Sequence, residues 1–228
     1  MDFFMRRRYC TEASGVEVNE DIALRRAYFD MVDDGDQTAR GAEACEVVLR
    51  AVADKKLRVV GSPFGDSFCA TSTSVLHAAL LRCSASIVWR LIFELGVPTV
   101  DVDVDVYGHT AMHIAATSPV DALAKCQMLD ARDLGKEDKL GQSPLESYLV
   151  MCYFGAGPPG AVCRWMMEQP ECPLHTSMMR AMMHRGYYCQ EIRQMRQDAL
   201  AVRKNWTAAR AAWLVAAVAV CVQVNFLP

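Results

Sequence analysis

Three hydroxyl side chains, each followed by a short apolar pattern of helical period, recur along this chain at nearly equal intervals. They are Ser74, Thr110 and Ser143, and the intervals are 110 − 74 = 36 and 143 − 110 = 33 residues. A Ser or Thr just before a helix stabilises its first turn, because the side-chain oxygen accepts a bond from an otherwise unpaired backbone N–H. Fixed spacing with matching chemistry is the signature of stacked repeats. The chain is therefore predicted to be all-α, a solenoid of stacked helix pairs.

The middle unit shows this pattern most completely. Gly108 supplies the permissive backbone of a tight turn, and Thr110 follows it as the predicted helix cap. Small or apolar side chains then recur on one helical face at i, i+3 and i+4, namely Met112, Ala115 and Ala116. The stretch therefore predicts a turn that leads directly into a short helix.

Each unit is expected to hold a second helix and a connection to the next unit. The first unit should contain helices over 74–82 and 86–95, and the second helix of the next unit should run over 120–129. Asp and Val alternate within 97–106, which favours an extended hairpin finger with valines inward. The polar segment 130–140 is also predicted to be extended.

The recurring unit resembles the ankyrin repeat, whose period is about 33 residues and whose core motif reads Thr-Pro-Leu-His-x-Ala. The matching residues are Ser74, Leu76, His77 and Ala79 in the first unit, Gly108, Thr110, Met112, His113 and Ala115 in the second, and Gly141, Ser143, Pro144 and Leu145 in the third. The first unit lacks the preceding Asp and Gly. In the third, Glu146 replaces the histidine and Tyr148 the alanine. The resemblance covers residues 68–169.

The resemblance divides the chain into three parts. Residues 1–67 are expected to form an N-terminal helical cap, 68–175 about three repeats, and 176–228 a degenerate cap repeat followed by a hydrophobic C-terminal helix. In the first part, helices are predicted over 21–32 and 41–55. The second of these, with the turn 35–38 before it, is interpreted as a first half-unit.

The C-terminal flank holds two further signals. Thr176 lies 33 residues after Ser143 and opens a faint echo of the motif, which predicts another helix there. The methionines between Met166 and Met183 are predicted to pack in the core at the end of the stack. The alternative is that they form an adaptable binding surface, because Met repacks easily.

An ankyrin stack implies a non-enzymatic scaffold or adaptor whose partner is another protein, with no small-molecule substrate and no cofactor. Its histidines, His77 and His113, are interpreted as structural braces that bond the backbone of a neighbouring turn. The predicted partner contacts lie on the fingers: Asp103, Asp105, Tyr107, His109, Lys136 and Lys139.

The third unit, which reads Gly-Gln-Ser-Pro-Leu-Glu-Ser-Tyr over 141–148, is similar to units of the divergent ankyrin proteins of large DNA viruses, especially poxviruses. That resemblance implies a host-interaction role in the cytoplasm. Members of that group often carry a C-terminal F-box-like segment that recruits a ubiquitin ligase. No such segment is recognisable here.

Composition and motifs argue against several other functional classes. A net charge of −3 gives no electrostatic case for nucleic acid. No signal peptide is visible, so the ten cysteines are expected to be free thiols in a reducing compartment. Cys163, Cys172, His175 and His184 match no common zinc spacing. The aspartates at 101, 103 and 105 lack the glycine and glutamate of a calcium loop. No nucleophile with a base, and no phosphate loop, can be named.

The C-terminal part contains an uninterrupted apolar run over 211–222, and Gln223 and Asn225 break it before residues 226–227. Arg203, Lys204 and Arg210 precede it. One hypothesis is that this helix is buried on the last repeat or on a partner. The alternative is a tail-anchored membrane protein that presents its repeats to the cytosol through residues 211–227.

Overall fold

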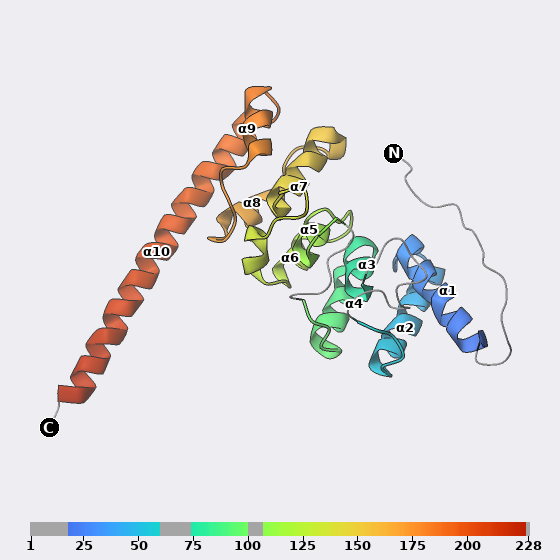
Figure 1. Cartoon of the computed structure of the whole chain (residues 1–228). Coiled ribbons are helices and arrows are strands. Elements are labelled where there is room, and N and C mark those ends of the chain that lie inside the picture. The colour runs from blue at the N-terminus through green and yellow to red at the C-terminus, as the bar shows by residue number, and fades with distance from the viewer. Residues whose placement is uncertain (1–17, 60–73, 100–106, 227–228) are drawn as a thin grey trace.

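The computed structural model describes residues 18–59, 74–99 and 107–226, and within these every regular element is a helix (Figure 1). The predicted all-α class is therefore confirmed for the described part of the chain. The predicted finger 97–106 lies mostly outside it, and so do Asp103 and Asp105.

The N-terminal helices are α1 (Val18–Asp34) and α2 (Ala39–Ala53). Thr38 begins α2, because its hydroxyl oxygen accepts the Gly41 N–H at 3.0 Å. However, α1 is the helix that packs against α3 (Val75–Arg82). The helix of the predicted half-unit over 35–55 is α2, which packs against α1. Tyr28 and Met31 of α1 are buried, so α1 supplies the apolar face that continues the row of helices.

The next two pairs follow the predicted plan. In the first, α3 leads to α4 (Ala85–Trp89), which continues through a π-helical turn η1 (Arg90–Glu94). Gly96, at φ +66°, follows this helix as predicted. In the second, α5 (Ala111–Ala116) leads to α6 (Ala122–Gln127).

The prediction that 130–140 is extended is wrong in its first half. A 3-10 helix, η2 (Ala131–Gly135), forms there because the Asp130 carboxylate accepts the Arg132 N–H at 2.9 Å. Leu134 of this turn is fully buried. Packing of that side chain therefore favours a helical turn over an extended strand.

The last two pairs lie at the C-terminal side of the stack. Helix α7 (Pro144–Met151) runs into a π-helical turn η3 (Cys152–Ala156) and is followed by α8 (Ala161–Glu168). Helix α9 (Ser177–His184) begins after Thr176, as predicted, and α10 (Cys189–Phe226) completes the pair.

The helices form two rows. In one row α1 packs on α3, α3 on α5, α5 on α7 and α7 on α9; in the other α4 packs on α6, α6 on α8 and α8 on α10. Figure 1 shows the pairs following one another along the molecule, with the C-terminal part of α10 projecting away from the rest. Each pair therefore buries its apolar faces against its neighbours, as a solenoid requires.

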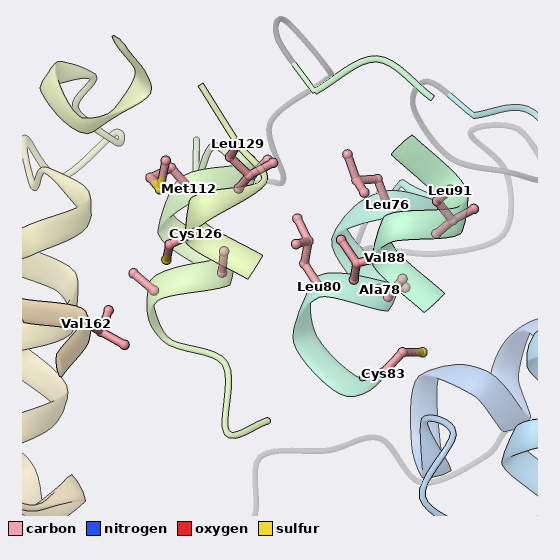
Figure 2. Packing of buried hydrophobic residues seen from close by; sticks show 14 of the residues in the cluster. Leu76, Ala78, Leu80, Cys83, Val88, Leu91, Met112, Cys126, Leu129 and Val162 are labelled. Carbon is pink, nitrogen blue, oxygen red and sulfur yellow. The ribbon is translucent and has the colours of Figure 1, made fainter. Parts of the chain in front are cut away.

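The core is continuous between neighbouring pairs. Leu80 of α3 is directed toward the α5–α6 pair, while Cys83 is directed toward α1 and α2 (Figure 2). There the Cys83 Sγ lies 3.6 Å from the Cys45 Sγ, both as buried free thiols. Of the methionines predicted to pack in the core, Met166, Met167, Met179 and Met182 are buried, and Met178 and Met183 are half-buried against the same core.

Replacement of Ala111 by proline tests whether α5 and α7 begin in the same way. Ala111 is the first residue of α5, the position that Pro144 occupies in α7. The first helical N–H needs no helical partner, and Thr110 already has the extended backbone (φ −77°, ψ 167°) that a following proline favours. Ala111→Pro should raise the free energy of unfolding by about 0.5 kcal/mol in denaturant titrations.

The control is Ala115→Pro, in the interior of the same helix. It removes a helical hydrogen bond and should cost about 3 kcal/mol or more. Destabilisation of more than about 1 kcal/mol by Ala111→Pro would show that the two helix starts are not equivalent.

Candidate functional site

Four helices of one row begin with the same hydrogen bond. In each, a side-chain hydroxyl oxygen accepts the backbone N–H three residues later, which satisfies one of the unpaired donors of the first turn. The bonds run from His77 to Ser74 at 3.2 Å, His113 to Thr110 at 3.4 Å, Glu146 to Ser143 at 3.3 Å and Met179 to Thr176 at 3.1 Å. The repeat seen in the sequence is therefore a repeat of local geometry.

His113 connects its own helix start to the next unit. Its Nδ1 accepts the Thr110 N–H at 3.1 Å, so the ring proton belongs on Nε2. Nε2 lies 2.9 Å from the carbonyl oxygen of Gln142 and donates to it. The ring is buried. This is the bracing bond that the sequence predicts for His113.

Glu146 makes the corresponding connection with opposite polarity. Its Oε1 accepts the N–H of Ser177 at 2.9 Å and of Met178 at 3.3 Å, and the Ser177 hydroxyl donates to it at 2.7 Å. An acidic side chain at the start of α9 also interacts favourably with the helix dipole. Where the histidine of the motif is lost, a carboxylate that bonds the next helix start therefore replaces it.

The turn before α7 is held by Asp138. Its Oδ1 accepts the N–H of Leu140 at 2.7 Å and of Gln142 at 2.9 Å, and its carbonyl oxygen accepts the Gly141 N–H at 3.0 Å. Gly141 has φ +73°, a conformation that favours glycine. The carboxylate and the glycine together fix the shape of this loop.

This turn is bonded directly to the turn of the preceding unit. The Lys139 N–H donates to the carbonyl oxygen of Tyr107 at 2.9 Å. Gly108 has φ +81°, and a Cβ placed there would lie 2.9 Å from the Lys139 Cγ. The predicted need for glycine at 108 thus has two causes, the backbone conformation and the close approach of the next loop.

Two large exposed side chains lie on these joined turns. Tyr107 is 58% exposed and Leu140 is 72% exposed. The His109 ring packs at a tilt against the rings of Tyr107 and His113, with centroids 5.7 Å from each. Its Nε2 lies 3.5 Å from Asp138 Oδ2. We call Tyr107, His109, Lys139 and Leu140 the fingertip surface.

Of the predicted partner contacts in the described residues, the structure brings Tyr107, His109 and Lys139 together. Lys136 follows η2, and its Nζ lies 3.0 Å from the Asp133 carboxylate. Leu140 was missed by sequence reasoning, because a leucine in a polar segment resembles a core residue. Its position two residues after Asp138, inside the turn, is the signal that could have identified it.

A buried lysine, Lys125 of α6, was also not anticipated. Its Nζ donates to the Leu80 carbonyl oxygen and to the Ser118 hydroxyl oxygen, each at 2.8 Å. Burial lowers the pKa of this amine to about 8. The two hydrogen bonds connect neighbouring units of the stack. Because the side chain is fully buried, the amine is closed to a substrate.

The described thiols are free and mostly buried. Burial raises the pKa of the Cys126 and Cys172 thiols to about 12, so the nucleophilic thiolate form is suppressed in both. Among the residues whose placement is described, no group of three or more His, Cys, Asp or Glu side chains is arranged to hold a metal ion.

The start of α10 is docked on the stack. Ile192, Met195 and Ala199 are buried, and Arg203 donates to the carbonyl oxygens of Met167 at 2.9 Å and Cys172 at 2.8 Å. The guanidinium thus holds the helix against the loop after α8. From Lys204 to Leu214 every side chain is exposed. The hypothesis that the run 211–222 is buried on the last repeat is therefore wrong for residues 211–214, and the side chains of 215–222 lie outside the described part. No helix in the described part of the chain is long and apolar enough to cross a membrane.

Comparisons of the chain with protein-family models, with curated proteins and with solved structures give no match.

The ionisation of Lys125 should make stability depend on pH in a defined direction. Between the folded pKa of about 8 and the unfolded value of 10.5, the unfolded chain binds the proton and the folded chain does not. The free energy of unfolding due to this group therefore rises with pH across that window, by about 3 kcal/mol at most.

The measurement is the difference in unfolding free energy between the parent and Lys125→Met, taken from pH 7 to pH 10.5. Taking the difference cancels the contributions of the thiols and tyrosines, which titrate in the same pH range. The free energy of unfolding of the parent should increase relative to that of Lys125→Met as the pH rises. A difference that stays constant or falls as the pH rises would contradict the claim that burial lowers the pKa of the Lys125 amine.

Proposed function

We propose that this chain is a non-enzymatic scaffold or adaptor for protein–protein interaction, built on ankyrin repeats. The observation that carries the proposal is the repeated helix start, in which a hydroxyl cap recurs every 33 to 36 residues and a bracing side chain follows it in two of the units. A solenoid of this kind offers an extended rigid surface and no enclosed catalytic cleft.

Burial of the motif residues supports the ankyrin assignment. Leu76, Met112 and Leu145, at the leucine position of the motif, are fully buried, and so are Ala79 and Ala115 at its alanine position. Side chains that recur in sequence thus recur in environment. In the third unit, Tyr148 takes the place of the alanine, and its hydroxyl oxygen accepts the Gly160 N–H at 3.2 Å. The larger side chain is accommodated because it is bonded to the loop before α8.

The fingertip surface has the chemistry of a protein contact. It presents an aromatic ring and an aliphatic side chain, Tyr107 and Leu140, beside the cation Lys139. Exposed tyrosines contribute strongly to protein interfaces, because they bury a large area at a small cost in side-chain entropy. The cross-linked turns beneath them lower the cost of ordering a loop on binding. A partner would therefore meet a preorganised surface.

The resemblance to the divergent ankyrin proteins of large DNA viruses makes a cytoplasmic host protein the first class of partner to test. Nothing in the described residues identifies a ubiquitin-ligase contact, and no such role is proposed.

Affinity capture tests the proposal by comparing the full parent chain with a full chain whose fingertip surface is altered. The variant Tyr107→Ala with Leu140→Ala should recover at least about ten-fold less of any specific partner, because two exposed anchors are lost. The readout is quantitative mass spectrometry of proteins captured from lysate, followed by binding of the purified partner.

The matched control is Trp89→Ala with Phe93→Ala. These rings are also exposed and lie 5.7 Å apart, but on α4 and η1 in the other row of helices. The control should bind as the parent does. Equal loss in both double variants, or no loss in either, would overturn the fingertip surface as the binding site.

A further inference from the structure

In the second half of α10, every side chain that the structure describes, up to Leu214, is exposed. The helix continues to Phe226, and Figure 1 shows it extending away from the packed pairs. Trp206 is 60% exposed and Trp213 is 70% exposed, and Leu214 is exposed beside them. A single helix in water is marginal without packing. An environment that covers these side chains would therefore stabilise this part of the helix.

The sequence of this segment specifies what kind of environment fits. Every residue from Ala211 to Val222 is apolar, so the helix is apolar on all sides and not along one stripe. A protein groove or a second helix covers only one stripe, and such contacts select amphipathic helices. A helix that is apolar all round is suited to a fully apolar surrounding, and hydrocarbon is one such surrounding.

The charges and aromatic rings are placed for a membrane surface. Lys204 and Arg210 are exposed immediately before the apolar run, and no acidic residue follows Asp198 in the helix. Basic side chains beside an inserted segment are attracted to anionic headgroups. Trp206 and Trp213 lie where the polar part gives way to the apolar part, and tryptophan favours the membrane–water interface.

The length of the run is compatible with insertion. From Ala211 to Phe226 the helix is about 24 Å long, which is shorter than the roughly 30 Å hydrocarbon core of a bilayer. The run can therefore enter the bilayer from one side without crossing it.

We propose that the apolar end of α10, residues 211–226, inserts into a lipid bilayer, with Lys204 and Arg210 at anionic headgroups and the helical stack held at the surface. This is a second binding function, separate from the fingertip surface. It would stand even if no protein partner bound there.

Flotation of the purified full chain with vesicles tests the proposal. The vesicles are phosphatidylcholine alone, and phosphatidylcholine with phosphatidylserine as the minor lipid. The chain should float with both and more completely with the anionic vesicles. Tryptophan emission should shift to the blue on binding, and Trp213→Phe should reduce that shift.

Two leucines on the same helix give a matched pair of variants. Leu214→Glu places a charge in the apolar run and should reduce the vesicle-bound fraction at least about ten-fold. Leu200→Glu makes the same change at an exposed position of the docked half, and should bind as the parent does. Both leucines are exposed, so the stack should unfold at the same temperature in both variants. Lys204→Gln with Arg210→Gln should abolish the preference for anionic vesicles.

Three results would overturn the proposal. The first is a parent chain that fails to float with either vesicle. The second is a Leu214→Glu variant that floats like the parent. The third is a lipid-free parent that light scattering shows to be a stable oligomer and that Leu214→Glu converts to a monomer, because a second copy would then cover the helix.

Discussion

The stack depends on one kind of polar contact, made where one unit meets the next. A hydroxyl begins four helices of the first row, α3, α5, α7 and α9. In two of these, α5 and α7, the residue three positions later reaches the following unit. His113 donates to the Gln142 carbonyl, and Glu146 accepts from the start of α9. Both side chains are buried, where an unmade hydrogen bond would be costly. These contacts therefore fix the register of neighbouring units, while apolar burial supplies most of the favourable free energy.

The same contacts shape the surface that we assign to a partner. The carbonyl that His113 bonds belongs to Gln142, the residue after the Asp138–Gly141 turn, and that turn bonds Tyr107 through Lys139. The fingertip surface is consequently attached to the core through backbone groups. Its side chains could vary without loss of the frame, which is how repeat proteins separate stability from recognition.

The sequence predicts the frame well because local chemistry determines it. Ser74, Thr110, Ser143 and Thr176 each begin a helix where their spacing places one. Features that depend on distant contacts could not be read in this way. Lys125 is buried because a carbonyl 45 residues earlier, at Leu80, receives its amine. Leu140 is exposed because Asp138 turns the chain there, and η2 replaces an extended segment because Leu134 finds a place in the core. The exposure of α10 from Lys204 to Leu214 could not be predicted either, because an apolar sequence does not indicate which surface, if any, covers it.

The most direct test of the bracing contact is a double-mutant cycle between Glu146 and Ser177, whose Oε1 and Oγ lie 2.7 Å apart. The free energies of unfolding of Glu146→Ala, Ser177→Ala and the double variant would be measured against the parent. The account predicts a coupling of about 1 kcal/mol or more, because the bond is partly buried, has a carboxylate as its acceptor and joins two units. Additive effects, with no coupling, would contradict the claim that this contact holds neighbouring units in register.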